Sequence, residues 1–98
     1  MAYEIVIKKR FTYKVQKVLT YLEKEWSSKV ASEFLLKIDH RISLLVTQPE
    51  IGAPSLKVKD VRGVLITRHN KMYYQIKNNK VIILNLYDTR INPKKKRY

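Results

Sequence analysis

The chain begins with a short stretch of alternating residues and continues with two longer stretches whose apolar residues recur at helical spacing. Residues 3–8, YEIVIK, alternate in the manner of a half-buried strand. The first helical stripe contains Val15, Val18, Leu19, Leu22 and Trp26, and the second repeats Val30, Phe34, Ile38, Ile42 and Leu45. Residues at this spacing fall on one face of a helix. The pattern therefore predicts one strand followed by two amphipathic helices.

Polar and helix-breaking residues mark the ends of these helices. Thr12 is predicted to be the N-cap of the first helix, and Ser27–Ser28 both ends that helix and caps the second. Two prolines and a glycine in residues 47–54, TQPEIGAP, force a loop. The two helices form a hairpin whose apolar stripes must pack against another layer. We expect Trp26 to be buried between the hairpin and that layer.

Three later segments are rich in β-branched and aromatic residues, as strands are. They cover residues 63–68, 71–77 and 80–88, with tight turns predicted at His69–Asn70 and Asn78–Asn79. The last segment is apolar on both faces, which favours a central strand. Neighbouring residues of a strand point to opposite faces, so one of Tyr73 and Tyr74 should lie in the core and the other on the surface.

The order β-α-α-β-β-β predicts an α+β fold, in which an N-terminal helical hairpin packs on one face of a small, mostly antiparallel sheet. The 98 residues, 45% of them hydrophobic, suffice for one core. We place a single domain at residues 1–98, with a basic tail at 92–98. The start of the chain lacks the pattern of a signal peptide, and no apolar run approaches the ~20 residues of a membrane span. We therefore expect a cytoplasmic protein.

Positive charge is concentrated in the second half of the chain. The net charge is +13, from 21 basic and 8 acidic residues. Residues 1–49 hold 9 basic and 5 acidic residues, a net of +4, and residues 50–98 hold 12 and 3, a net of +9. Such a field attracts polyanions, namely nucleic acid, an acidic protein or anionic lipid. Nothing apolar flanks the basic tail to anchor it, so a membrane partner is not expected.

Metal and cofactor chemistry is not indicated. Cysteine is absent, and His40 and His69 have no second ligand at a telling spacing. The chain has two glycines, Gly52 and Gly63, and no phosphate-binding glycine loop. His40 lies beside Asp39 on a polar helix face, which does not suggest a Ser-His-Asp site. No metal and no cofactor are expected.

Basic and aromatic residues gather at the ends of the predicted strands. They are Arg62, Arg68, His69, Lys71, Tyr87 and Arg90. If pairing brings these ends to one concave surface, arginines there can clamp phosphates through two hydrogen bonds and tyrosines can stack on bases. The alternative is that the arginines are scattered surface charges. Asp88 can hold Arg90 or Arg62 in place by a charge-assisted hydrogen bond.

Three segments together resemble the RelE/ParE superfamily of bacterial toxins from type II toxin–antitoxin modules, also known as plasmid stabilisation proteins. ASEFLLKIDHRISLLVTQPEIGAP, residues 31–54, is similar to the second helix of the family and the Pro-x-x-Gly loop after it. VRGVLITRHNKMYYQI, residues 61–76, resembles its Arg-Gly strand and Tyr-rich strand, and YDTRINP, residues 87–93, its Arg-x-x-Pro terminus. The resemblance covers nearly the whole chain.

The resemblance implies a growth-arresting toxin that is neutralised by a cognate antitoxin. RelE-like members cut messenger RNA on the ribosome without a metal, whereas ParE-like members poison DNA gyrase and show no nuclease set. The candidate catalytic residues are Arg62, Arg68, Tyr87 and Arg90. The candidate residues for binding nucleic acid or another target are Lys57, Lys59, His69, Lys71, Lys94, Lys95, Lys96 and Arg97.

The two targets leave the question of catalysis open. Segment GVLIT lacks the catalytic lysines that RelE-like enzymes tend to carry on this strand, although Lys57 and Lys59 precede it. A general base is not evident unless Glu50 or His69 serves. The long hairpin is more similar to ParE. Outside the toxin family, the alternative is a non-toxic basic module that binds nucleic acid with the same surface.

Overall fold

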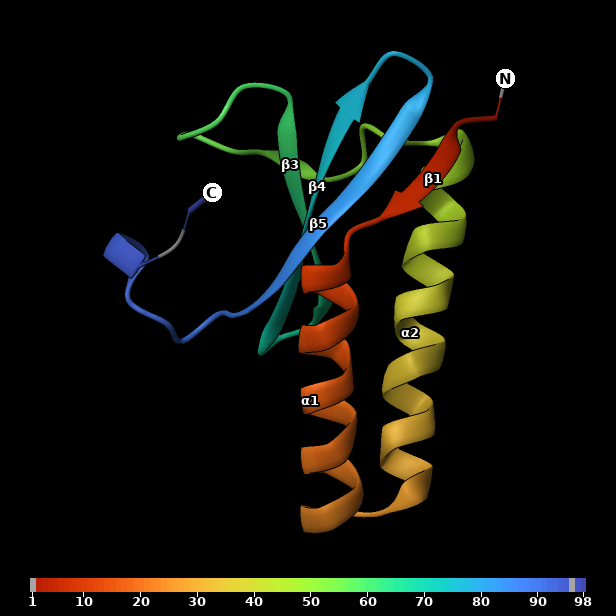
Figure 1. The fold of residues 1–98 in the computed structure, drawn as a ribbon, viewed down its shortest axis with the longest axis vertical. Helices are drawn as coiled ribbons and strands as arrows, with labels where there is room; N and C mark the ends of the chain where they lie inside the picture. Colours follow the sequence, from red (N-terminus) through yellow and green to blue (C-terminus); the bar gives the residue numbers. More distant parts are fainter. Residues whose placement is uncertain (1, 96) are drawn as a thin grey trace.

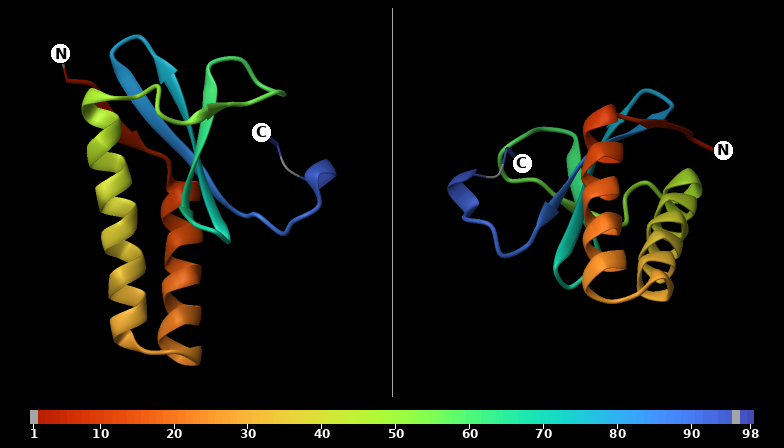
Figure 2. Two further views of the ribbon diagram at one scale, coloured as in Figure 1. Left: turned by 180° about the vertical axis from the view of Figure 1, so that it is seen from behind. Right: turned by 60° about the horizontal axis from the view of Figure 1, so that its bottom comes forward.

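The computed structural model describes residues 2–95 and 97–98. Along these residues the elements are β1 (Glu4–Ile7), α1 (Lys9–Glu25), α2 (Ser28–Thr47), β2 (Ala53–Pro54), β3 (Val61–Thr67), β4 (Asn70–Lys77), β5 (Lys80–Asp88) and the 3-10 turn η1 (Pro93–Lys95). The described strands form one five-stranded sheet in the order β1-β5-β4-β3-β2. The two helices pack as a hairpin on one face of it (Figure 1; Figure 2). The predicted α+β fold is confirmed.

The sheet is mixed because β1 runs parallel to β5, while the other neighbours are antiparallel. β5 lies inside the sheet between β1 and β4, as its two apolar faces predicted. The turn at Asn78–Asn79 is confirmed, and Asn78 has a φ of 57°, which asparagine tolerates. The turn between β3 and β4 lies at Arg68–His69, one residue before the predicted position. The two-residue strand β2 was not predicted.

The caps of the helices were predicted correctly for α2 and wrongly for α1. The Ser27 hydroxyl accepts a hydrogen bond from the backbone N–H of Val30 at 3.1 Å and caps α2. Thr12 is not a cap, because α1 already begins at Lys9. The backbone N–H of Lys8 donates to the Ile83 carbonyl at 3.0 Å, so the sheet fixes the point at which the chain leaves β1.

The core lies between the hairpin and the sheet. Its buried cluster comprises Phe11, Val15, Phe34, Ile38, Leu45, Ile66, Met72, Tyr74, Val81, Ile83 and Leu86. Both predicted stripes contribute to this cluster, but burial fades along α1 toward the hairpin connection. Val18, Leu19 and Leu22 are half-buried, and Trp26 is 70% exposed.

The expected burial of Trp26 is therefore wrong. The connecting end of the hairpin extends past the β3–β4 turn (Figure 1), so no strand lies beneath it. Trp26 follows the last helical residue and donates its backbone N–H to the Leu22 carbonyl at 2.9 Å. Its indole is a surface group.

Candidate functional site

The end of β5 presents a self-contained ion pair. Arg90 donates from Nε to Asp88 Oδ1 at 2.9 Å and from Nη2 to Asp88 Oδ2 at 2.7 Å, and its backbone N–H donates to the same carboxylate at 2.8 Å. The hydrogen bonds from Arg90 lower the pKa of Asp88 to about 2. The two side chains remain 68% and 46% exposed. The expectation that Asp88 holds Arg90 is confirmed, and the alternative that Asp88 holds Arg62 is wrong.

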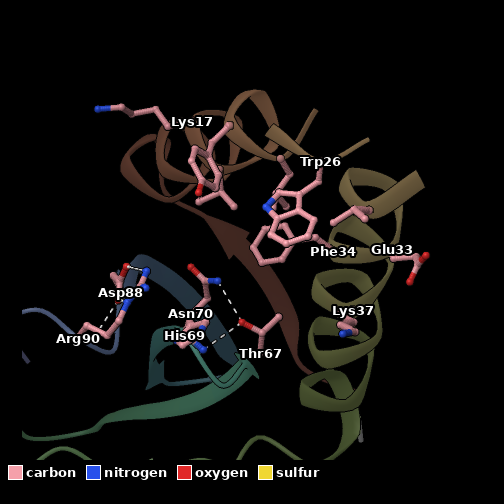
Figure 3. Close-up of a pocket in the computed structure, with 14 residues that line it drawn as sticks. Lys17, Trp26, Glu33, Phe34, Lys37, Thr67, His69, Asn70, Asp88 and Arg90 are labelled. Carbon is pink, nitrogen blue, oxygen red and sulfur yellow. Dashed lines mark hydrogen bonds and ion pairs between the residues drawn. The ribbon is translucent and has the colours of Figure 1, made fainter. Parts of the chain in front are cut away.

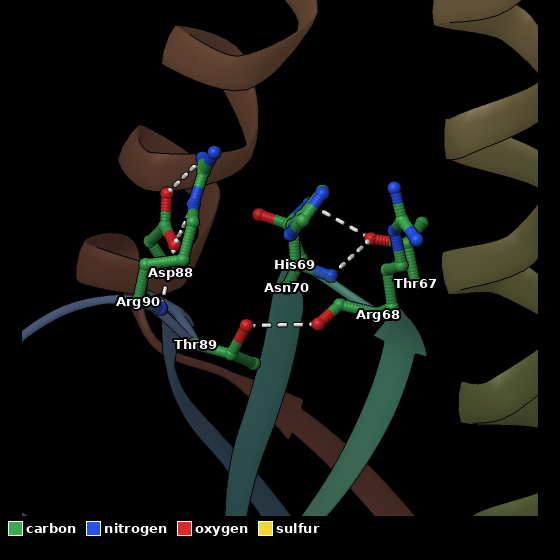
Figure 4. A network of polar contacts seen from close by, with 7 residues as sticks. All are labelled: Thr67, Arg68, His69, Asn70, Asp88, Thr89 and Arg90. Carbon is green, nitrogen blue, oxygen red and sulfur yellow. Dashed lines mark hydrogen bonds and ion pairs between the residues drawn. The ribbon is translucent and has the colours of Figure 1, made fainter.

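The segment carrying this pair is fastened to the β3–β4 turn (Figure 4). The Thr89 hydroxyl donates to the Arg68 carbonyl at 2.8 Å, and the Thr89 backbone N–H donates to the His69 carbonyl at 2.9 Å. Within the turn, the Thr67 hydroxyl accepts hydrogen bonds from His69 and Asn70. These contacts bring Arg68, His69 and Arg90 to one end of the sheet.

Arg62 has a different position and a different set of partners. It stands opposite Tyr74 in the β3–β4 ladder, and its Nη1 donates to the Gly52 carbonyl at 2.8 Å and to the Glu50 carbonyl at 3.2 Å. Arg62 lies in β3 and Arg68 follows the end of this strand, six positions later, a separation of roughly 20 Å at about 3.3 Å per residue of extended chain. Arg62 therefore ties the loop after α2 to the sheet and lies far from Arg68.

The buried hydroxyl of Tyr74 completes this attachment. It donates to the Pro49 carbonyl at 2.7 Å and accepts from the Gly52 backbone N–H at 2.9 Å. Burial raises the pKa of Tyr74, an effect that the hydrogen bond from Gly52 partly offsets. The loop between α2 and β2 is thus held by two side chains of the sheet.

The face of the sheet opposite the helices, called the open face from here on, carries aromatic and basic residues. Lys71 pairs with Tyr87 across β4 and β5. The Tyr73 and Tyr87 rings meet edge to face with centroids 5.7 Å apart. Lys14 Nζ lies 5.2 Å from the centroid of the Tyr87 ring, and Lys71 Nζ lies 5.4 Å from that of Tyr73, both within the range of a cation–π contact.

Tyr73 and Tyr74 were expected to divide into one core and one surface residue. They do point to opposite faces, but both are buried, at 6% and 0% exposure. Tyr74 belongs to the core cluster, whereas Tyr73 is covered on the open face by Tyr87 and Tyr98. Tyr98, from the tail, was missed because nothing local in the sequence relates it to Tyr73.

A second surface lies between the hairpin and the end of the sheet (Figure 3). It is an open groove of about 860 Å³. Its lining comes from both helices, the β3–β4 turn and the end of β5: Lys17, Val18, Tyr21, Leu22, Trp26, Val30, Glu33, Phe34, Lys37, Thr67, His69, Asn70, Asp88 and Arg90. Tyr21 and Trp26 are 58% and 70% exposed. The predicted helical stripe contained Trp26 but not Tyr21, and the sequence alone does not show where the sheet stops covering the helix.

The predicted site residues are thus distributed over separate places. His69 and Arg90 line the groove, whereas Lys71 and Tyr87 lie on the open face and Arg62 under the α2–β2 loop. Lys57 lines a smaller hollow with Lys71 and Tyr98, and Lys59, Lys94, Lys95 and Arg97 are exposed. Lys96 lies outside the described residues.

The described residues were also compared with the requirements of a metal site and of a membrane-spanning helix. Among the residues that the structure describes, no group of three or more His, Asp or Glu side chains could hold a metal ion. No helix in this described part of the chain is both long and apolar enough to cross a membrane.

The order of elements, with a helical hairpin on one face of a mixed five-stranded sheet, defines a RelE/ParE-like toxin fold. The model of the family "ParE toxin of type II toxin-antitoxin system, parDE" matches residues 5–93. The chain therefore belongs to this family of type II toxins. No match was found among curated proteins.

Solved structures with this fold include several toxin–antitoxin proteins. The chromosomal ParDE system from P. aeruginosa is 13% identical with a TM-score of 0.75, covering 89% of this chain and 96% of that one. The E. coli DinJ-YafQ complex is 10% identical with a TM-score of 0.65, covering 90% and 93%. The RelBE2 complex from Mycobacterium tuberculosis is 13% identical with a TM-score of 0.61, covering 90% and 99%. At these identities the likeness establishes the fold alone.

Proposed function

We propose that this toxin arrests growth in the cytoplasm by poisoning DNA gyrase, as ParE-like members of the superfamily do, and that it does not cut RNA. The match to the ParE family supports this choice. The observation that carries it is the separation of the four candidate catalytic residues, which lie at three places and do not converge on one point.

Metal-independent RNA cleavage needs a base and several charge-stabilising groups within hydrogen-bond reach of a single phosphate. Arg62 uses its guanidinium on two loop carbonyls, and Arg90 uses two of its N–H groups on Asp88. A guanidinium whose fork already holds a carboxylate gains less from a phosphate, because the pair carries no net charge. Both arginines are better explained as parts of the scaffold than as parts of a nuclease site.

We further propose that a cognate antitoxin covers the groove between the hairpin and the sheet. Exposed Trp and Tyr side chains, such as Trp26 and Tyr21, are the residue types that dominate binding at protein interfaces. The groove also exposes Lys17 and Lys37, and the chain as a whole carries +13. An amphipathic segment with apolar residues toward Trp26 and acidic residues toward the lysines fits this surface, and it would order as it binds.

The target is tested by inducing the protein and following DNA, RNA and protein synthesis together. We expect DNA synthesis to stop first with an SOS response, and the purified toxin to increase cleaved DNA in a gyrase reaction. Early loss of translation with cut messages would instead identify a RelE-like nuclease acting on ribosome-bound mRNA. Normal growth with well-folded protein would favour the non-toxic nucleic-acid-binding module.

The antitoxin surface is tested with Trp26→Ala and the protein encoded beside the toxin gene. The variant should still arrest growth, because Trp26 is a surface group, but co-expression of the antitoxin should no longer rescue the cells. Tyr13→Ala is the matched control, since Tyr13 is an aromatic residue of α1 that is 61% exposed and does not line the groove. Full rescue of Trp26→Ala would place the antitoxin elsewhere.

A further inference from the structure

The tail returns to the sheet and places an aromatic ring on the open face. The Tyr98 ring stacks on Tyr73 with centroids 5.4 Å apart and an interplanar angle of 30°. The same ring meets Tyr87 at 6.1 Å and 60°. After β5, the blue tail turns back toward the loop that precedes β3 (Figure 1; Figure 2). Three tyrosines from β4, β5 and the tail therefore form one cluster.

The sheet leaves room for this cluster at Gly63. Gly63 stands opposite Tyr73 in the β3–β4 ladder. A Cβ atom at Gly63 would lie 2.9 Å from Tyr73 Cε1 and 2.6 Å from Lys71 Cε. Because Gly63 has no side chain, the Tyr73 ring can lie over β3, and the Tyr98 ring stacks on it.

The backbone of Tyr98 is held by a preorganised donor. The Ser55 hydroxyl accepts hydrogen bonds from the backbone N–H groups of Lys57 at 3.1 Å and Val58 at 3.2 Å. With both acceptor positions of the oxygen used, its single hydrogen is directed to a main-chain oxygen of Tyr98 at 2.6 Å. The site thus receives both the ring and a main-chain oxygen of one residue.

The electrostatics of this contact are unfavourable to the tail. The tail carries Lys94, Lys95 and Arg97, and the tyrosine rings are already contacted by Lys71 of the open face and by Lys14, which reaches Tyr87 from α1. Like charges therefore oppose the docking of Tyr98, whereas an acidic segment would be attracted to the same site. Ring stacking and the Ser55 hydrogen bond hold the tail against this repulsion.

We propose that Tyr98 is an intramolecular clasp that masks a binding site for an aromatic residue within an acidic peptide segment. The ring of that residue takes the place of Tyr98 on Tyr73 and Tyr87, its carbonyl takes the hydrogen bond from Ser55, and its acidic neighbours meet Lys14 and Lys71. The identity of this segment with part of an antitoxin rests on the proposed function. The site itself does not depend on the target of the toxin.

The clasp is tested with purified full-length protein and a blocked synthetic peptide, Glu-Asp-Glu-Tyr-Glu-Asp. If Tyr98 masks the site about nine-tenths of the time, the apparent affinity is about tenfold below the intrinsic one. We therefore expect Tyr98→Ala to bind the peptide about tenfold more tightly than the unaltered chain, and Tyr13→Ala to bind like the unaltered chain. Adding Lys71→Gln to Tyr98→Ala should weaken binding again, as should replacing the tyrosine of the peptide by alanine.

Each alternative outcome has its own meaning. Equal affinity of the Tyr98→Ala and unaltered proteins overturns the clasp. A gain in affinity for a thymidine oligonucleotide without a gain for the peptide overturns the proposed ligand and identifies a nucleic-acid site. Melting curves of every variant check that it is folded. Because binding is measured in solution, a failure here is separate from a failure of growth arrest or of antitoxin rescue.

Discussion

The loop between α2 and β2 depends on one buried hydroxyl, and Tyr74→Phe removes that atom while keeping the ring. The Tyr74 hydroxyl is bonded to the Pro49 carbonyl at 2.7 Å and to the Gly52 N–H at 2.9 Å, and the residue is 0% exposed. Phenylalanine fits the same space in the core. The substitution therefore leaves a buried carbonyl and a buried N–H without this partner.

An unsatisfied buried polar group costs about 1–3 kcal/mol. The loop can shift to recover part of this loss, because Glu50 and Ile51 are exposed. We therefore expect the free energy of unfolding to fall by about 2–3 kcal/mol. For a domain of this size, each kcal/mol lowers the melting temperature by about 4–8 °C.

Urea unfolding followed by circular dichroism measures this change, with Tyr13→Phe as the control at a tyrosine that is 61% exposed. A loss below about 0.5 kcal/mol for Tyr74→Phe would contradict the reasoning, since Pro49 and Gly52 must then have other partners. Alkaline pH gives a second test. Folding raises the pKa of Tyr74, so its contribution is present below the ordinary tyrosine pKa of about 10 and is lost as the pH rises further. The unaltered protein should lose more stability there than Tyr74→Phe.

Three further predictions concern residues of the candidate site. Arg62→Ala should lower the unfolding free energy by about 1–2 kcal/mol, since its loop contacts are charge-assisted but only half-buried. An unchanged denaturant melt together with lost toxicity would instead indicate that Arg62 belongs to the functional surface. Trp26→Ala should change stability by less than about 1 kcal/mol in the same melt, because the indole is 70% exposed, and a larger loss would mean that the indole packs in solution. Arg90→Ala should let the pKa of Asp88 rise from about 2 toward its ordinary value, as followed by carboxyl NMR; an unchanged pKa would show that Arg90 is not its cause.

The sequence predicts the elements of the fold well where the signal is local. The two apolar stripes place both helices, and Ser27 caps α2 with its own side chain three residues away. Thr12 fails as a cap because the start of α1 is set by a distant contact, the hydrogen bond from Lys8 to Ile83 of β5. The predicted burial of Trp26 is wrong for a related reason. A helical stripe indicates which face is apolar, but it does not show how far the opposing sheet extends.

In the candidate site too, local contacts could be predicted from the sequence, whereas contacts between distant residues could not. Asp88 and Arg90 are two residues apart, so their pairing could be inferred from the sequence. The partners of Arg62 lie ten and twelve residues away in an irregular loop, and no periodic pattern links them. The tyrosine cluster of the open face is assembled from β4, β5 and the tail, and Lys14 reaches the Tyr87 ring from α1, so Lys14 and Tyr98 join it only through the tertiary fold.

Neighbouring residues at the end of β5 point to opposite faces of the sheet, so Tyr87 and Asp88 belong to two different surfaces. Tyr87 turns to the open face, where lysines lie over the tyrosine rings, and Asp88 lines the groove that Trp26 also lines. Because Asp88 neutralises Arg90, the ion pair adds little net charge to the groove, whose exposed Trp26 and Tyr21 instead suit apolar recognition. The positive field of the second half is carried more strongly by the open face and the tail. A partner that covers only the groove would leave that field exposed, so on the proposed clasp an antitoxin segment that neutralises this charge would extend past the end of β5 and take the place of Tyr98.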